Sequence, residues 1–173
     1  MLEFNTLGQI AWLWSNSDLH REWSVSTMSN FILPPIVYNQ YILVQHEDGF
    51  PAAYCSWAFL NDSAELNYIA NSSHIEPSDW NTGSNIWIVD FISPFGTAYT
   101  KKVFNSLKEN FSDKIISAIR VKKPSKTGRI KSYLSNNILP NDRRRRKSDR
   151  FLDLTSRLKQ DTGFKTQFSE VSI

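Results

Sequence analysis

Two side chains of this 173-residue chain could perform acid–base chemistry, His20 and Asp90. An imidazole changes charge near neutral pH, so His20 could accept a proton from a substrate. Asp90 stands in the apolar run Ile86–Ile92 and is expected to share a face with its isoleucines, where an ionised carboxylate is costly without a partner. A structural aspartate bonded to the amides of the following turn is an equally good interpretation. The two residues are candidates for a catalytic pair, which their types alone do not establish.

The other side chains that could attack a substrate or bind a metal give weaker signals. Cys55 is the only cysteine, which excludes an intramolecular disulfide, and without an adjacent activating base it is expected to be a small strand residue. His46 abuts a predicted turn and His74 lies in a polar stretch, so both are expected to be exposed bystanders. Because no histidines or acids recur at a metal-ligand spacing, the sequence predicts no metal site.

Charge is distributed unevenly along the chain. Residues 1–100 contain one basic and ten acidic side chains, a net charge of −9, whereas residues 101–173 contain 19 basic and seven acidic side chains, a net charge of +12. An anionic partner is therefore expected for the C-terminal part: an acidic protein, a phosphate-bearing ligand or a nucleic acid. The densest run consists of Arg143, Arg144, Arg145, Arg146 and Lys147. A solvated loop or tail is the alternative interpretation of that run.

Composition favours a single domain over residues 1–173, with a basic segment of unassigned structure at about 129–173. At 40% hydrophobic and 13% aromatic residues, the chain can bury one sizeable core. Met1–Phe4 carries an acid rather than a basic cluster, and no apolar run approaches the length that spans a bilayer. We therefore expect a cytoplasmic protein without a signal peptide or membrane span, and the single cysteine fits a reducing compartment.

Hydrophobic periodicity predicts the elements that must position His20. Apolar residues at helical spacing indicate a helix over about 6–15. A second helix is expected to begin after Ser17 and to end by Leu33, because Pro34-Pro35 cannot continue it. His20 would then lie in a first helical turn.

The elements around Asp90 are predicted to be strands. Residues 41–45 and 52–60 flank a Glu-Asp-Gly turn and indicate an antiparallel hairpin. Residues 66–69 are a weaker strand candidate, and the polar residues 71–85 indicate a loop. The apolar run that contains Asp90 is expected to be the central strand, covered on both faces.

The turn Ser93-Pro94-Phe95-Gly96 ends that strand and precedes a predicted helix over 97–110. Free amides at such a helix start suit a phosphate, and Lys101 and Lys102 would favour a bound anion. A strand over 115–121 and a last helix, marked by apolar residues from Phe151 onward, complete the pattern. It predicts an α/β (α+β) fold with a single mixed, mostly antiparallel sheet flanked by helices.

Four segments, in order along the chain, resemble the toxin-activating lysine acyltransferases that accompany repeats-in-toxin cytolysins. They are residues 11–23 (AWLWSNSDLHREW), 39–43 (NQYIL), 51–58 (PAAYCSWA) and 87–96 (WIVDFISPFG). The resemblance runs from about Leu7 to Gly128 when Ala118-Ile119-Arg120-Val121 is included, and it does not extend to the arginine run. Four aligned, tryptophan-rich segments are a far more specific signal than one short motif.

The resemblance implies a fold similar to that of the Gcn5-related N-acetyltransferases and a reaction that moves a fatty-acyl chain from acyl carrier protein to an internal lysine of a bacterial protoxin. It assigns His20 and Asp90 as catalytic, with Ser17 in a supporting role, and Gly96 and Arg120 in the matching segments are expected to support substrate binding. The co-substrate would be the phosphopantetheine thioester of the carrier protein, so no tightly bound cofactor is expected. The basic C-terminal part, with Lys101, Lys102 and Arg143–Lys147, would dock the acidic carrier protein.

Three alternatives remain open at this point. A coenzyme A-dependent acetyltransferase of small molecules would need an Arg/Gln-x-x-Gly-x-Gly/Ala loop before the 97–110 helix, where Ser93–Gly96 stands instead. A nucleic-acid-binding module built on the arginine run would need stacking aromatics, which lie mostly in the acidic part, so no nucleic acid is expected. A non-catalytic chaperone of the protoxin is the third. The sequence leaves the acyl chain length, the target lysine and the oligomeric state, including a homodimer, undecided.

Overall fold

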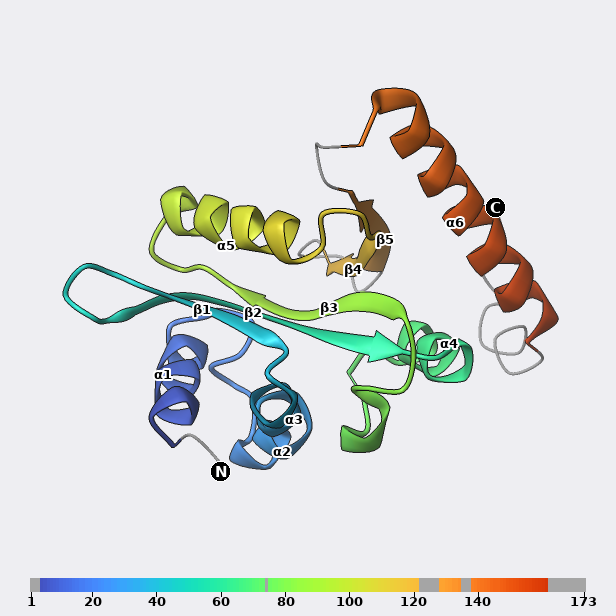
Figure 1. Cartoon of the computed structure of the whole chain (residues 1–173). Coiled ribbons are helices and arrows are strands. Elements are labelled where there is room, and N and C mark those ends of the chain that lie inside the picture. The colour runs from blue at the N-terminus through green and yellow to red at the C-terminus, as the bar shows by residue number, and fades with distance from the viewer. Residues whose placement is uncertain (1–3, 74, 122–127, 135–137, 162–173) are drawn as a thin grey trace.

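The computed structural model describes residues 4–73, 75–121, 128–134 and 138–161. A five-stranded sheet runs through its centre in the order β1-β2-β3-β4-β5 (Figure 1). Its strands are β1 Tyr41–Gln45, β2 Pro51–Leu60, β3 Asn85–Ile92, β4 Ile116–Val121 and β5 Gly128–Tyr133. Neighbouring strands pair antiparallel except β3 and β4, which are parallel. The predicted mixed, mostly antiparallel sheet with a central β3 is confirmed.

Helices cover both faces of the sheet. Figure 1 shows α1 with α2 and α3 on one face and α5 on the other. The α-helices are α1 Phe4–Ser15, α2 Met28–Phe31, α3 Leu33–Tyr38, α4 Asp62–Ala70, α5 Thr97–Asn110 and α6 Pro140–Gln160, with short 3-10 turns at Val25–Thr27 and Pro77–Asp79. Two hydrophobic clusters result, one with Ile10 and Leu13 of α1 and the other with Val103 and Leu107 of α5.

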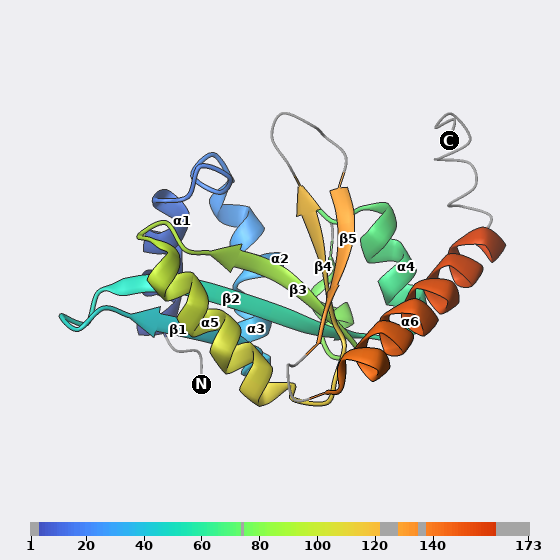
Figure 2. The same cartoon turned by 90° about the horizontal axis from the view of Figure 1, so that it is seen from above.

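The parallel strands β3 and β4 pair over a short length and then diverge. The paired residues are Ile86–Ile88 of β3 and Ile116–Ala118 of β4. Figure 2 shows β4 and β5 crossing away from the later part of β3. Within the described residues, the carboxyl half of β3, which contains Asp90, therefore has no pairing with β4.

A β-bulge in β3 decides which face Asp90 occupies. Ser56 of β2 pairs with Asp90 and the next residue of β2 pairs with Ile88, so Val89 is an extra residue. A bulge reverses the alternation of side chains that follows it. Ile88 accordingly packs in the cluster under α5, whereas the Asp90 carboxylate is bonded by Trp14 of α1. The expectation that Asp90 shares a face with the isoleucines at the start of its strand is therefore wrong.

The second predicted helix is also wrong in its extent. Residues 17–24 form turns, so His20 lies in a turn rather than in a first helical turn. Pro34 and Pro35 lie in the first turn of α3, which begins at Leu33, instead of only ending a longer helix. The first turn of a helix tolerates proline because its N–H groups have no intrahelical partner.

Residues 66–69, predicted as a weak strand, belong to helix α4. The Asn61 side chain caps this helix by accepting a hydrogen bond from the Ala64 N–H at 2.9 Å. Asp62 and Glu65 lie in the first turn, where negative charge is favourable. The helix cap and the acids of the first turn favour a helix, whereas the short apolar pattern of residues 66–69 is compatible with either a strand or a helix.

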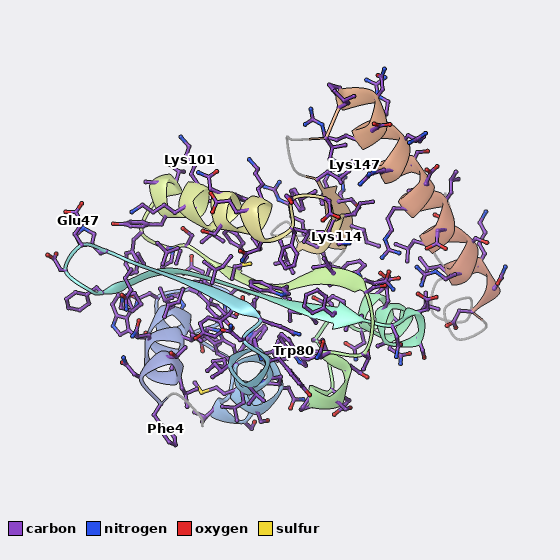
Figure 3. All side chains as sticks on the ribbon, in the orientation of Figure 1. Phe4, Glu47, Trp80, Lys101, Lys114 and Lys147 are labelled. Atoms are coloured by element: carbon purple, nitrogen blue, oxygen red, sulfur yellow. The ribbon has the colours of Figure 1, made fainter. Side chains whose placement is uncertain are left out.

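The arginine run lies on a long helix, so its interpretation as a loop or tail is wrong. All five basic residues belong to α6, and Figure 3 labels Lys147 on this helix. Helix α6 is fixed to α4 by Arg150 and Arg157, which both bind the fully buried Glu65. The run therefore has a defined position on the molecule.

Candidate active site

Ser17, His20 and Asp90 form one chain of hydrogen bonds. His20 Nε2 lies 3.0 Å from Asp90 Oδ1, and Ser17 Oγ lies 2.7 Å from His20 Nδ1. Trp14 Nε1 donates to the second carboxylate oxygen, Asp90 Oδ2, at 3.0 Å. His20 and Asp90 are both buried, whereas Ser17 is half-buried. The serine is thus the most accessible member of this chain.

The partners of the imidazole define its tautomer. An ionised carboxylate can only accept hydrogen bonds, so the nitrogen that faces Asp90, Nε2, must carry the hydrogen. Nδ1 is then the basic nitrogen, and it accepts a hydrogen bond from the Ser17 hydroxyl group. This order of carboxylate, imidazole and hydroxyl is the one that makes an imidazole a general base in acyl-transfer enzymes.

The turn that carries Ser17 and His20 is held by its own backbone. The amides of His20 and Arg21 both donate to the Ser17 carbonyl, at 3.1 and 3.0 Å. Trp14 stacks on the His20 ring with 5.3 Å between centroids, and Trp23 meets that ring edge-on at 4.6 Å. The imidazole is fixed in orientation by two indoles and two hydrogen bonds.

Protonated side chains surround Asp90 on the β2 side. Ser56 of β2 pairs with Asp90, and Tyr54 lies two residues before Ser56 on the same strand. Ser56 and Tyr54 are both fully buried. Burial, and then the negative charge of Asp90, raises the pKa of Tyr54 well above its usual value. The phenol therefore keeps its proton. The carboxylate is the group in this cluster whose charge must be balanced, and His20 is positioned to balance it.

Most of this chain matches one family of known proteins. The model of the RTX toxin acyltransferase family, HlyC, matches residues 1–134, which include the whole sheet and every member of the hydrogen-bonded chain. This chain belongs to the RTX toxin acyltransferase family. As a member of that family it is an acyltransferase, and the resemblance found in the four sequence segments is confirmed.

Relatives of this RTX toxin acyltransferase carry lysine-acyltransferase names. The RTX-II toxin-activating lysine-acyltransferase ApxIIC of Actinobacillus pleuropneumoniae is 45% identical over 130 residues, 74% of this chain and 79% of that protein. The protein-lysine myristoyltransferase RtxC of Kingella kingae is 41% identical over 138 residues, 80% and 81% of the two chains. The protein-lysine palmitoyltransferase CyaC of Bordetella bronchiseptica is 39% identical over 131 residues, 76% and 70% of the two chains.

The other predicted site residues of this acyltransferase lie away from the hydrogen-bonded chain. Gly96 caps α5 with a φ of 118°, in the region that favours glycine, and Lys101 and Lys102 follow on the exposed side of that helix. Figure 3 labels Lys101 on α5. Arg120 is an exposed residue of β4. Within the described part of the chain, no hydrogen bond, ion pair or ring contact joins these residues to Ser17, His20 or Asp90.

Cys55 and His46 occupy the places expected for them. Cys55 is buried in β2, and burial raises the pKa of its thiol well above the usual value, so it remains protonated. His46 is exposed at the hairpin and contacts Asp48 at 3.1 Å. His74 lies outside the described residues. Within the described ranges, no three His, Cys, Asp or Glu residues gather to hold a metal ion, and no helix has the length and apolar character to cross a membrane.

Two contributions to the site of this acyltransferase could not be read from the sequence. Trp14 has the spacing of an ordinary core residue of α1, and its bond to Asp90 joins residues 76 positions apart. The bulge at Val89 arises from the way β3 pairs with β2, and the sequence of β3 alone does not indicate that pairing. A tryptophan next to the half-buried Ser-x-x-His turn was the one available hint, because a buried indole N–H requires an acceptor.

Proposed function

We propose that the chain moves a fatty-acyl group from acyl carrier protein to the ε-amine of an internal lysine in an RTX protoxin, and thereby activates the toxin. The hydrogen-bonded chain of Ser17, His20 and Asp90 in a member of this acyltransferase family carries the proposal. The names of relatives as myristoyl- and palmitoyltransferases of protein lysines support a long-chain donor.

The reaction requires a base because lysine is mostly protonated at pH 7 and a protonated amine cannot attack. The neutral Nζ attacks the thioester carbonyl carbon, so a C–N bond forms as the C–S bond breaks. The ammonium proton of the lysine is lost before attack, and the attacking nitrogen then gives its second proton to His20 Nδ1. The imidazolium returns that proton to the leaving phosphopantetheine thiolate, which departs as a thiol, and His20 is again neutral. Asp90 stabilises the imidazolium and remains ionised itself.

Ser17 occupies the path between His20 and the half-open side of the site. Its hydroxyl fills the Nδ1 position at 2.7 Å, so an incoming amine either displaces it or passes its proton through it. Trp14 holds the far oxygen of Asp90, and in this scheme it keeps the carboxylate aligned with Nε2. The site is thus prepared before the lysine arrives, which lowers the reorganisation needed for transfer.

The donor would approach from the basic side of the molecule. The free amides of α5 behind Gly96, with Lys101 and Lys102, suit the phosphate of the phosphopantetheine arm. The exposed arginines of α6 and Arg120 supply positive charge for an acidic carrier protein. The donor is a co-substrate, so the proposal includes no tightly bound cofactor, and it places the reaction in the cytoplasm with the carrier protein.

Co-expression with an RTX protoxin, followed by intact-mass measurement and peptide mapping, tests the proposal. We expect a mass increase equal to one or more long acyl chains on lysine, which disappears with His20→Ala. A mass increase of acetyl size would support the coenzyme A alternative. An unmodified but haemolytic toxin would support a chaperone and overturn the proposal.

A further inference from the structure

A groove with aromatic walls runs along the outer side of α1. It has a volume of about 300 Å³. Its lining is mostly apolar and consists of Phe4, Asn5, Gly8, Gln9 and Trp12 of α1 with Phe50 and Pro51 of the hairpin. Figure 3 shows Phe4 at the start of α1 and Glu47 at the hairpin tip. We call this feature the α1 groove.

The aromatic side chains of the α1 groove are unusually exposed. The exposed fractions are 75% for Phe4, 39% for Trp12 and 63% for Phe50, and Phe95, against which Trp12 stacks at 5.4 Å, is 45% exposed. Contiguous exposed apolar surface marks a binding site more often than a structural one. Gly8 forms an open floor, because no described atom lies within 4 Å of the position that a side chain there would take.

One end of the α1 groove lies near the segments that carry the hydrogen-bonded chain of the active site. The side chains of Ser15 and Asn16 both donate to the Trp12 carbonyl, at 2.7 and 2.9 Å, and tie the end of α1 to the turn that holds Ser17. On its other side, Phe95 belongs to the turn that follows β3, the strand of Asp90. Trp12, at one end of the groove, therefore neighbours both segments that build the site.

The length and polarity of the α1 groove fit a hydrocarbon chain. The groove itself runs from Phe4 to Trp12, about 12 Å at 1.5 Å per residue. The path from Phe4 to the end of α1, next to the Ser17 turn, is about 18 Å, comparable to an extended myristoyl or palmitoyl chain. Gln45 Nε2 donates to Gln9 Oε1 at 2.8 Å, so the amide oxygen of Gln9, a polar lining residue, is already paired. Glu47 and Asp48 beside Phe50 disfavour an anionic lipid surface as the occupant.

We propose that the α1 groove binds the acyl chain of the donor and that Gly8 and Trp12 set the chain length accepted. This rests on the proposed function, because it names the place of that reaction's substrate. The thioester would lie at Ser17 and His20, with the methylene chain extending past Trp12 toward Phe4. Each methylene transferred from water to such a groove contributes about fourfold in affinity.

Filling the floor of the groove provides the test. Gly8→Leu adds a side chain into open space and replaces glycine with a better helix former, so the fold is retained. Asn105→Leu adds the same side chain to the exposed surface of α5 and is the matched control. We expect Gly8→Leu to lower kcat/KM by roughly tenfold or more for a myristoyl donor and little for an octanoyl donor, because the leucine displaces two or more methylenes.

Binding of free myristate to the purified chain, followed by calorimetry, separates this inference from the proposed function. Myristate should bind the wild type and Asn105→Leu alike and Gly8→Leu about tenfold more weakly. If myristate binds in this way but no protoxin is acylated, the groove stands and the proposed function fails. Equal myristate affinity in all three proteins overturns the groove assignment. The assignment is also overturned if Gly8→Leu changes only the KM of the acceptor, or if the wild type is a dimer that Gly8→Leu dissociates.

Discussion

The buried contacts of Glu65 give a stability prediction that can be worked out from the structure. Glu65 is fully buried, accepts from Trp87 Nε1 at 2.5 Å and from Arg157 Nη2 at 2.6 Å, and also binds Arg150. Glu65→Ala leaves one indole N–H without its acceptor and two mostly buried guanidinium groups without their shared partner. Breaking a buried ion pair from one side costs about 3–5 kcal/mol.

That loss corresponds to a decrease in melting temperature of roughly 6–20 °C for a chain of this size. Asp62→Ala is the matched control, because Asp62 is on the same helix and pairs with the same Arg157, at 3.2 Å, but its side chain is 73% exposed. An exposed pair contributes about 0–1 kcal/mol. Urea and thermal unfolding followed by circular dichroism measure both variants. If Glu65→Ala costs no more than Asp62→Ala, the contacts of Glu65 do not hold α6 in place.

Three further predictions concern the site and the charges. Trp14→Phe keeps a ring against His20 but removes the bond to Asp90 Oδ2, so we expect turnover to fall by roughly tenfold with little change in the KM of either substrate. The buried Cys55 thiol, with its raised pKa, should resist alkylation by iodoacetamide in the folded protein. Cys55→Ser should retain activity, and a stable acyl-thioester on Cys55 would contradict direct transfer. Replacement of Arg143–Lys147 by glutamine should raise the KM for acyl carrier protein and make that KM less dependent on salt concentration. Loss of DNA or RNA binding with an unchanged KM for the carrier protein would instead favour the nucleic-acid alternative.

The sequence was informative where local pattern and chemistry coincide. The apolar run at 86–92 predicted a central strand, and the helix over 97–110 followed from its apolar stripe and the preceding turn. His20 and Asp90 stood out because an imidazole and a strand carboxylate are unusual in their settings. Their pairing at 3.0 Å required the fold, because 70 residues separate them along the chain.

Long-range contacts account for what the sequence could not predict. Glu65 has the position of an ordinary acid in the first turn of α4, and its basic partners lie 85 and 92 residues away on α6. The bulge at Val89 changes the face of Asp90 through pairing with β2, and no property of Val89 itself announces it. The turn at residues 17–24 replaces a predicted helix because Ser17 and His20 are held by the site they form.

Single-turnover acylation by Asp90→Asn tests the central claim, that a carboxylate-held His20 is the base for lysine transfer. Asparagine keeps the size of the side chain and can still accept from Trp14, but its amide no longer fixes the hydrogen on His20 Nε2. Purified enzyme, acyl-carrier donor and protoxin are mixed at saturation, and acyl-lysine is followed by mass spectrometry, with circular dichroism as the check of folding. We expect a rate roughly 10⁴-fold below wild type in a folded protein, the effect of a wrong tautomer in this type of hydrogen-bonded chain. Transfer at the wild-type rate by folded Asp90→Asn would contradict the account.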